Sequence, residues 1–285
     1  MPVLTVVGNC QAESTRRLLM STGEFESERI KPVHEIEPED LGWFTELLAR
    51  TDVLVTQPIR DDYRGVPVGT SQMLAHLPRG ARHVVVPVMR FDGLMPYQAI
   101  IRNPENTSEN PPVVPYHDLR ILAAAARGLD NPANPEPSPE ALRRAAAMSV
   151  EQISIREHAH GSVVISDYLA TSPVWHTVNH PDNASLAVLA TRVLRELGIS
   201  ADPLLPDYEM LGQLDAPINA PSAAALGVAV TGRDEWRDRS TGRIDAFEIA
   251  SAQLEYYRRR PSVVEHGLVR HAERIANLGL LEARP

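Results

Sequence analysis

The sequence has a single cysteine, few aromatic residues and no long hydrophobic run. Because Cys10 is the only cysteine among 285 residues, no disulfide can form within the chain, and Cys10 is interpreted as a thiol. Aromatic residues make up 5% of the chain and are scattered, so they form no apparent sugar-binding platform. The apolar run at residues 3–7 is too short for a signal peptide or a membrane span, and no basic segment precedes it. These absences predict a cytoplasmic protein with no membrane span.

Positive charge is also scarce. Lys and Arg number 28 against 37 Asp and Glu, which gives a formal net charge of -9 without any dense basic run, so no nucleic-acid partner is expected. No metal is predicted, because there is no second cysteine and His158 and His160 lack the spacing that places two ligands on one helix face. Neither a glycine-rich dinucleotide motif nor a P-loop occurs, so any phosphate would have to be held by a helix terminus and scattered arginines.

The first 90 residues alternate between short apolar runs and helical patterns. Strands are predicted at residues 3–7, 52–56 and 83–88, with a weaker one at 29–33, and helices at 12–20, 38–49 and 70–77. Such alternation predicts an α/β fold with a small parallel sheet and right-handed crossovers. Ligands of such folds sit beyond the carboxyl ends of the strands.

Helical patterns dominate the rest of the chain. We predict exposed loops at residues 103–115 and 131–139, a short strand at 161–165, and helices at 119–129, 139–158, 183–197, 245–259 and 262–278. The arginine run at 258–260 is interpreted as a solvated helix end, and only secondarily as a phosphate clamp. We expect an α/β core at residues 1–200 that carries the site, and a helical C-terminal part at 201–285 packed on it. The oligomeric state stays open, and an oligomer is possible.

The turn after the first strand, Gly8-Asn9-Cys10-Gln11, is the main candidate for chemistry. Backbone N–H groups and the helix dipole at this position can lower the pKa of Cys10, which suits a nucleophile or an acyl acceptor. The competing interpretation is a buried, small hydrophobic residue. The Asn9 amide can donate to an oxyanion, or Asn9 can simply be a left-handed turn residue. Gln11 is equally ambiguous, and Gln57, after the strand at 52–56, is expected at the same sheet edge.

Two histidines, His176 and His180, lie just before the helix at 183–197. Histidine is the usual general base near neutral pH, and loop residues can be aimed into a cleft. The alternative for His176 is packing beside Trp175, and for His180 a loop position fixed by Pro181. We rank His180 higher, because rigid helix-capping residues surround it.

Three short motifs together resemble a known family: Val-Val-Gly-Asn-Cys-Gln-Ala at residues 6–12, Gln-Pro-Ile at 57–59 and Asn-His-Pro at 179–181. They are similar to the WcbI-type acetyltransferases of polysaccharide biosynthesis, from the first strand to about Leu197. The resemblance implies binding of coenzyme A (CoA) or acetyl-CoA, and O-acetylation of a sugar hydroxyl, on an α/β core with extensive helical additions. The turn also resembles the first block of the SGNH hydrolases. Those enzymes have Gly-Asp-Ser at this point, so their serine-esterase mechanism does not carry over.

The leading hypothesis is therefore an acyl-CoA-dependent O-acyltransferase, whose partners are a small-molecule acyl donor and a hydroxyl acceptor. His180 would remove the acceptor proton, and Asn9 would hold the oxyanion. Either Cys10 would first take the acyl group and pass it on, or the acyl group would pass directly from CoA to the acceptor. The alternatives are a Cys-dependent ester or thioester hydrolase and a non-catalytic ligand-binding protein. The predicted residues are, for catalysis, Cys10, His180 and Asn9, and, for CoA binding, Gly8, Gln11, Gln57 and His176.

Overall fold

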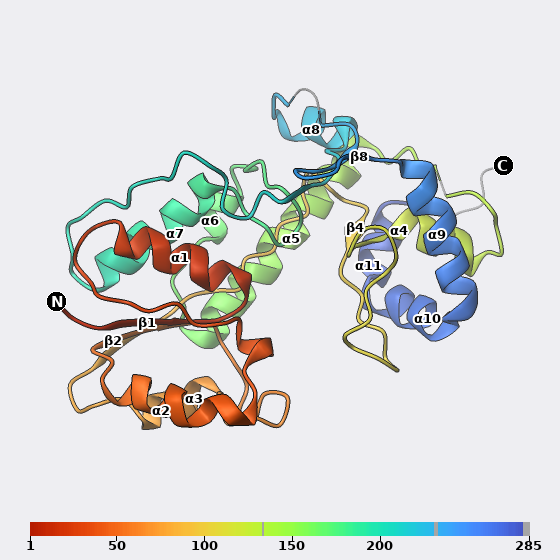
Figure 1. Ribbon diagram of the computed structural model, residues 1–285. Coiled ribbons are helices and arrows are strands. Elements are labelled where there is room, and N and C mark those ends of the chain that lie inside the picture. The colour runs from red at the N-terminus through yellow and green to blue at the C-terminus, as the bar shows by residue number, and fades with distance from the viewer. Residues whose placement is uncertain (133, 231–232, 282–285) are drawn as a thin grey trace. The chain divides into compact units, whose positions relative to one another are not determined.

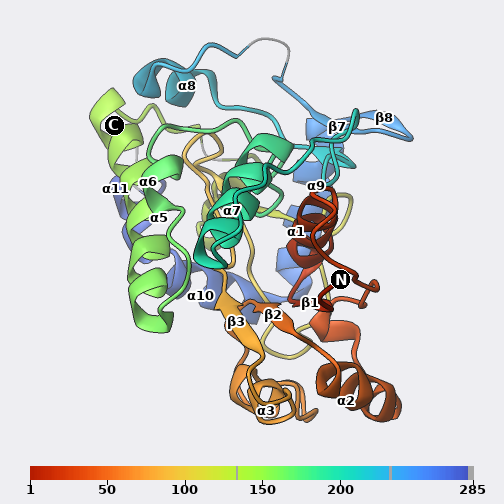
Figure 2. The ribbon, with the colours of Figure 1, turned by 90° about the vertical axis from the view of Figure 1, so that its left-hand side faces the viewer.

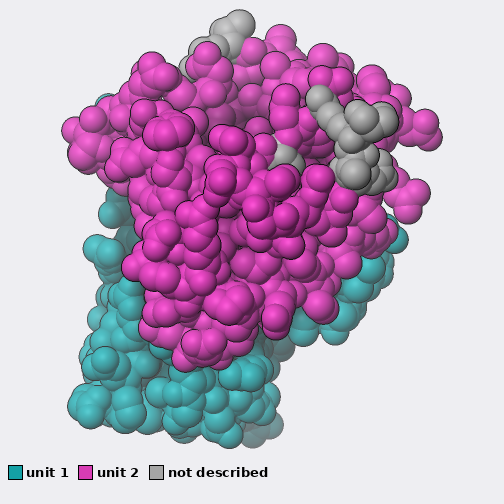
Figure 3. Space-filling model, turned by 90° about the vertical axis from the view of Figure 1, so that its right-hand side faces the viewer, with its two compact units in different colours: residues 1–90, 150–175, 180–212 teal, residues 91–149, 176–179, 213–285 magenta. Residues whose placement is uncertain are grey.

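The computed structural model describes residues 1–132, 134–230 and 233–281 (Figure 1). The fold is a mixed α/β fold with a small three-stranded parallel sheet and many helices, as predicted. The chain forms two compact units, each made of separate stretches of sequence and coloured in Figure 3. Unit 1 comprises residues 1–90, 150–175 and 180–212, and unit 2 comprises residues 91–149, 176–179 and 213–285. The domain boundary at residue 200 stays a prediction.

Unit 1 is built on the parallel sheet. Its strands are β1 (Leu4–Val7), β2 (Val53–Thr56) and β3 (Arg82–Val85), in the order β1-β2-β3, and they lie side by side in Figure 2. Leu4 pairs with Val53, and Val53 pairs in turn with Arg82. All residues of β1 and β2 are buried, which explains why both strands are continuous apolar runs without alternation. The carboxyl ends of the strands therefore share one edge.

Helices cover both faces of this sheet. In Figures 1 and 2, α1 and α7 lie on one face, and α2 and α3 lie on the other. The apolar core between the sheet and α2 and α3 includes Leu54, Phe44 and Met73. The helices of unit 1 are α1 (Cys10–Met20), α2 (Leu41–Ala49), α3 (Thr70–Ala75), α6 (Ser166–Leu169) and α7 (Asn183–Glu196), with α5 (Pro139–His160) shared between the units. The predicted helices at 12–20, 38–49, 70–77 and 183–197 are thus confirmed.

The predicted strand at residues 29–33 is wrong. The segment ends in a short 3₁₀ helix, Val33–Glu35, and Val33 N donates a 2.8 Å hydrogen bond to Gly8 O just beyond β1. Pro32 lacks a backbone N–H group, so this segment cannot complete a ladder beside β1.

The predicted strand at residues 161–165 is also wrong. Val163 N donates to Val85 O at 2.9 Å, at the end of β3. The buried Glu157 carboxylate then accepts from Ile165 N at 2.7 Å and from Ser166 N at 3.0 Å. These donors are bound by a side chain, so they do not form a strand ladder, and the chain turns into α6.

Unit 2 is mainly helical, with two small antiparallel sheets. Its core surrounds α4 and includes Leu119, Leu122 and Tyr257. The predicted helix at 262–278 is two helices that meet at His271. The strands have two or three residues each, too few to show a period in the sequence. The elements are α4 (Leu119–Ala126), α8 (Ala220–Leu226), α9 (Ala246–Arg259), α10 (Pro261–Arg270), α11 (Ala272–Asn277), β4 (Gln98–Ala99), β5 (His117–Asp118), β6 (Leu214–Asp215), β7 (Trp236–Asp238) and β8 (Gly242–Ile244).

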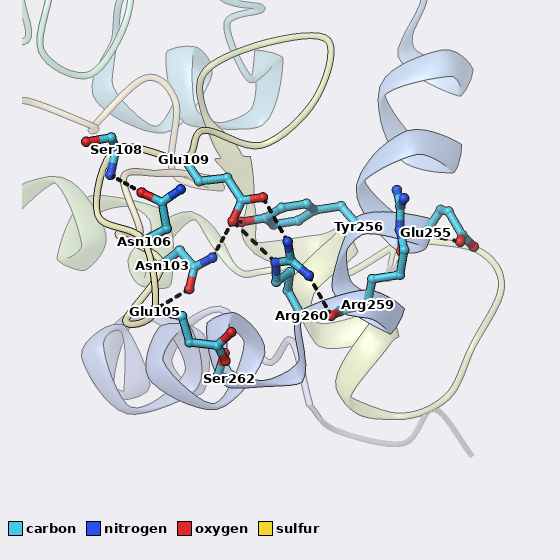
Figure 4. A network of polar contacts seen from close by, with 10 residues as sticks. All are labelled: Asn103, Glu105, Asn106, Ser108, Glu109, Glu255, Tyr256, Arg259, Arg260 and Ser262. Carbon is cyan, nitrogen blue, oxygen red and sulfur yellow. Dashed lines mark hydrogen bonds and ion pairs between the residues drawn. The ribbon is translucent and has the colours of Figure 1, made fainter.

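The arginine run at the end of α9 is paired with carboxylates (Figure 4). Arg260 Nε lies 3.4 Å from Glu109 Oε2, and Tyr256 Oη lies 3.5 Å from the same oxygen. Asn103 also donates to Glu109, and these contacts lower the pKa of Glu109. The other ion pairs of the run join Arg258 to Asp130 and Arg259 to Glu255. The run is therefore a helix end whose charges are balanced by the protein, which favours the first of its two interpretations.

Candidate active site

The turn after β1 holds Asn9 as the N-cap of α1. Its backbone is extended, with φ −80° and ψ −161°, and its Oδ1 accepts a 2.9 Å hydrogen bond from Gln11 N. The left-handed interpretation of Asn9 is thereby excluded. Because a backbone N–H group requires an oxygen acceptor, the orientation of the amide is fixed and Nδ2 remains as the donor of this side chain.

Gln57, the residue after β2, lies directly over the turn. Its Oε1 accepts from Asn9 N at 2.9 Å, and its Nε2 donates to Gln11 Oε1 at 3.2 Å. A Cβ atom on Gly8 would lie 2.6 Å from Gln57 Oε1. Glycine is required at position 8 because the Gln57 side chain fills the space that a larger residue would occupy.

Gln11 extends this amide network to the segment after β3. Its Nε2 donates to Met89 O at 2.8 Å, and its Oε1 accepts from Met89 N at 3.0 Å. Gln11 is 1% exposed and Gln57 is 4% exposed. The network therefore ties together the segments that follow all three strands, at the carboxyl edge where the sequence places the site. CoA binding by Gln11 and Gln57 stays a prediction. In the structure their side chains hold the turn in place by hydrogen bonds.

The Cys10 thiol lies at the first position of α1 and is partly exposed. Burial raises the pKa of the Cys10 thiol above its ordinary value, and the opposing backbone hydrogen bonds of Cys10 and Gln11 do not compensate. The expectation of a lowered pKa is therefore wrong. The helix terminus does favour the thiolate, but the surrounding protein removes more water from the sulfur than the terminus offsets.

A cavity of about 250 Å³ opens beside Cys10 and is also lined by Gly8 and Asn9. Its wall carries the basic side chains Arg17, Arg29 and Lys31 and the acidic side chain of Glu13. Three cations against one carboxylate give this cavity an excess of positive charge, which suits an anionic ligand. Scattered arginines were expected to hold phosphate, but these particular residues could not be predicted, because no local motif joins α1 to residues 29–31.

Two of these cations are held in place by neighbours. Arg17 Nε donates to Glu13 Oε1 at 2.9 Å, and its Nη1 donates to Tyr208 Oη at 2.5 Å. Lys31 Nζ lies 2.5 Å from Asp40 Oδ2. The positive wall is therefore oriented before any ligand arrives.

The two candidate histidines belong to different units. His180, in unit 1, is partly exposed and precedes α7, whose N-cap Asp182 accepts from Ser185 N at 2.9 Å. It is not among the residues that line the Cys10 cavity in the described part of the chain. His176, in unit 2, is 8% exposed, so its predicted packing agrees with its burial. The roles of both histidines stay predictions.

His176 also has a carboxylate partner that the sequence did not reveal. Its Nδ1 lies 2.7 Å from Asp215 Oδ1, and Arg233 Nη2 lies 3.9 Å from the same oxygen. Burial raises the pKa of Asp215, but the hydrogen bond with His176 and the charge of Arg233 outweigh it, so the pKa is lowered. An ionised Asp215 orients the imidazole. The residues lie 39 positions apart, so no spacing could have indicated the pair.

The structure also bears on metal binding and on membrane insertion. In residues 1–132, 134–230 and 233–281, no three His, Cys, Asp or Glu side chains are grouped so as to hold a metal ion. Within the same residues, no helix is both long and apolar enough to cross a membrane.

Comparison with known proteins identifies the family. The family model described as "Polysaccharide biosynthesis enzyme WcbI" matches residues 3–202. The chain belongs to the WcbI family. A solved structure of WcbI, described as a novel polysaccharide biosynthesis enzyme, shares 17% sequence identity with a TM-score of 0.80, and the match covers 99% of each chain. That protein is described as the native form without a disulfide bond between CoA and one of its cysteines. No curated protein matches the sequence significantly. The resemblance seen in the three motifs is thus confirmed, and so is the fold class.

Proposed function

We propose that this protein is an acyl-CoA-dependent O-acyltransferase that moves an acetyl group from acetyl-CoA to a hydroxyl group of a sugar. The observation that carries the proposal is the cavity beside Cys10, which combines the only thiol of the chain with Arg17, Arg29 and Lys31. The cationic side chains suit the phosphates of CoA, and Cys10 marks where its thiol end would lie. Because the pantetheine arm keeps these two ends apart, CoA would extend from the cavity and would not place both ends in it. The description of the structural neighbour, which names CoA together with a cysteine, supports the same ligand.

The size of the cavity limits how CoA would bind. At about 250 Å³ it is smaller than the roughly 300–1,000 Å³ pockets that enclose drug-sized ligands, so it would enclose one part of CoA and leave the rest outside. The arginine and lysine side chains would hold phosphate oxygens.

The chemistry we propose is direct transfer. His180 takes the proton of the acceptor hydroxyl as its oxygen attacks the thioester carbonyl, and the Asn9 Nδ2 group stabilises the oxyanion. A C–O bond forms, the C–S bond breaks, and the departing CoA thiolate takes from His180 the proton that came from the acceptor hydroxyl. Burial raises the pKa of Cys10, which keeps it mainly a neutral thiol and disfavours a covalent acyl-enzyme. In this proposal Cys10 shapes the cavity beside the thioester.

The test combines CoA binding with thiol release. Calorimetry should detect CoA and acetyl-CoA, with affinity that falls as salt rises, since charge pairs are screened. Thiol release from acetyl-CoA should require a sugar acceptor and should persist in Cys10→Ser. No calorimetric signal at near-millimolar CoA would remove the main support for a transferase. Thiol release without an acceptor would instead indicate a hydrolase, and complete loss in Cys10→Ser would replace direct transfer by covalent transfer.

A further inference from the structure

Unit 2 contains a second, larger cavity that the reaction above does not use. Its volume is about 500 Å³, within the roughly 300–1,000 Å³ range of small-molecule sites. It lies among α4, α9, β7 and the segment that leads into α8, all within unit 2. Its volume is that of a small-molecule site, and its lining is separate from that of the Cys10 cavity.

One part of its lining is aromatic. The rings of Tyr116 and Trp236 are stacked, with centroids 5.7 Å apart and planes inclined by 20°. Tyr97 adds a third ring, and the Arg120 guanidinium lies over it, 4.6 Å from the centroid. This cluster could not be predicted from the sequence, because its members lie far apart along the chain. Tyr116 is 4% exposed and Tyr97 is 7% exposed, so the partly exposed Trp236, backed by Tyr116, is the ring whose face would pack against the C–H face of a pyranose.

The second part of the lining is polar and held in position. Asp118 and Arg120 form a two-pronged ion pair, with Arg120 Nη2 2.6 Å from Asp118 Oδ2 and Nε 3.0 Å from Oδ1. Asn219 Oδ1 accepts from Ser222 N at 2.9 Å, so its amide nitrogen remains as a donor. Hydroxyl groups both donate and accept, so a sugar can use each of these groups.

Gln98 supplies the most direct sign of a missing ligand. It lines the cavity and is 7% exposed. Its Oε1 accepts from Val178 N at 2.8 Å, but its buried Nε2 has no hydrogen-bond partner among the described residues. Buried polar groups of folded proteins are nearly always paired, so this donor, which has almost no exposed surface, needs an acceptor that the described residues do not supply and that a ligand or water reaching it would provide.

The charge of the lining selects against phosphates. Asp118, Asp234 and Glu235 line the cavity together with one guanidinium, that of Arg120. Arg120 is paired with Asp118, and Glu235 is paired with Arg243 and Arg237. His117 adds no positive charge near neutral pH, because burial lowers its pKa to about 4. The cation of the lining is therefore already paired with a carboxylate, which disfavours phosphates and acidic sugars, whereas neutral polyhydroxyl ligands need no such cation.

We propose that unit 2 carries a binding site for a neutral sugar, in which the stacked Tyr116 and Trp236 support the ring and Gln98, Asn219 and the Asp118–Arg120 pair bind its hydroxyl groups. The sugar site stands on the cavity alone. That its occupant is the acceptor of acetyl transfer rests on the proposed function.

Saturation-transfer NMR and calorimetry with methyl hexopyranosides and neutral disaccharides test the site directly, without acetyl-CoA. The wild type should bind at least one of them, and methyl glucuronide should bind more weakly. Trp236→Ala should weaken sugar binding by at least about tenfold, since large aromatic anchors dominate such sites. Trp236→Phe, which retains a ring for stacking, should lose less. Trp43→Ala is the matched control, because Trp43 is 40% exposed in unit 1 and does not line this cavity.

CoA binding and acetyl transfer, measured on the same variants, distinguish failure of the sugar site from failure of the proposed transferase. Urea unfolding checks that unit 2 is folded in Trp236→Ala, because CoA, whose proposed site lies in unit 1, reports only that unit 1 is intact. A wild type that binds none of the neutral sugars, a Trp236→Ala variant that binds them as well as the wild type does, or tighter binding of the glucuronide would each overturn the sugar site. Sugar binding without acetyl transfer would leave this site standing and remove the transferase. Transfer without detectable sugar binding in unit 2 would do the reverse.

Discussion

Two cavities, the one beside Cys10 in unit 1 and the larger one in unit 2, have different linings. The cavity of unit 1 has Arg17, Arg29 and Lys31 against Glu13, and it adjoins the Cys10 thiol. The cavity of unit 2 has three carboxylates against one arginine, together with three aromatic rings. The two linings favour different ligands, because the cations of the first suit phosphates, whereas the one guanidinium of the second is already paired with Asp118. This difference agrees with the two proposals, a phosphate-bearing donor in unit 1 and a neutral sugar in unit 2.

The units also differ in how their cavities are held. In unit 1 an amide network ties the turn of the site to a short parallel sheet through Gln11 and Gln57. In unit 2 the stacking of Tyr116 on Trp236 joins elements that are far apart in the sequence, and a local ion pair fixes Asp118 and Arg120. A site next to one strand can be found from a local motif, whereas a site assembled from distant elements cannot.

The largest expected effect is on turnover, and it tests which of the two units supplies the general base. His180→Ala, in unit 1, should lower turnover by roughly 10²- to 10⁴-fold, because it removes a general base that touches the acceptor proton. CoA affinity should stay nearly unchanged. His176→Ala, in unit 2, should lose stability rather than turnover, since it leaves Asp215 without its imidazole partner. Steady-state rates of folded variants, checked by calorimetric CoA binding, provide the measurement.

The reverse outcome has a clear structural meaning. If His176→Ala abolishes transfer and His180→Ala retains it, the His176 and Asp215 pair is the base, with the carboxylate orienting the imidazole. Asp215→Asn should then reduce turnover as well. Full activity of both histidine variants would place the base elsewhere.

The second prediction concerns acid, which should weaken unit 2. Burial lowers the pKa of His117 to about 4 and that of His271 to about 3. Unfolded histidine titrates near about 6.5, so below that pH the unfolded chain binds protons that the folded unit does not. Stability is thus fully present above about pH 6.5 and falls as the pH drops towards 4. For His117 alone the loss is on the order of 3 kcal/mol.

Urea unfolding between pH 7.5 and 4.5, with hydrogen exchange to locate the change, measures this effect. Amides of unit 2 should lose protection first. His117→Gln retains a side-chain donor for Ile101 O, which lies 3.1 Å from His117 Nε2, and should flatten the pH dependence. A variant with the same pH slope as the wild type would show that His117 does not carry the effect.

Much of unit 1 was predictable from the sequence for physical reasons. Buried parallel strands are continuous apolar runs, so β1 and β2 could be recognised, and the turn after β1 followed from Gly8. The partly exposed β3 was found from the β-branched residues of the run at 83–88. The predictions of strands at 29–33 and 161–165 failed because apolar residues such as Ile30 and Ile165 are buried there without a strand ladder. Pro32 and the Glu157 carboxylate, rather than hydropathy, decide their conformation.

Less of the site was predictable. The sequence placed Asn9, Cys10 and Gln57 at one edge, but the pKa of Cys10 depends on how much protein surrounds the sulfur, which no motif encodes. The partnership of His176 with Asp215 and the stacking of Tyr116 on Trp236 depend on long-range packing. Pair contacts of this kind appear only when the fold is known.

The smallest expected effect is a loss of stability when the turn after β1 in unit 1 is overpacked. Gly8→Ala places a Cβ atom 2.6 Å from Gln57 Oε1 and 2.8 Å from its Cδ. Gln57 is 4% exposed and bonded to Asn9 N at 2.9 Å, so it cannot swing away without breaking the network. Overpacking of this kind costs about 1–3 kcal/mol. Chemical denaturation should show that loss, and CoA affinity should fall with it.

Gly42→Ala is the matched control for this substitution. Gly42 lies in α2, is exposed, and has no atom within 4 Å of an added Cβ. Alanine should therefore leave stability unchanged or raise it by up to about 0.5–1 kcal/mol, since glycine loses more backbone entropy in a helix. Sugar binding should be the same in both variants, because the turn of unit 1 does not line the cavity of unit 2. If Gly8→Ala is as stable as the wild type and binds CoA equally well, Gln57 moves freely. The amide network then does not hold the turn, and the rigidity we assign to the unit 1 cavity has another source.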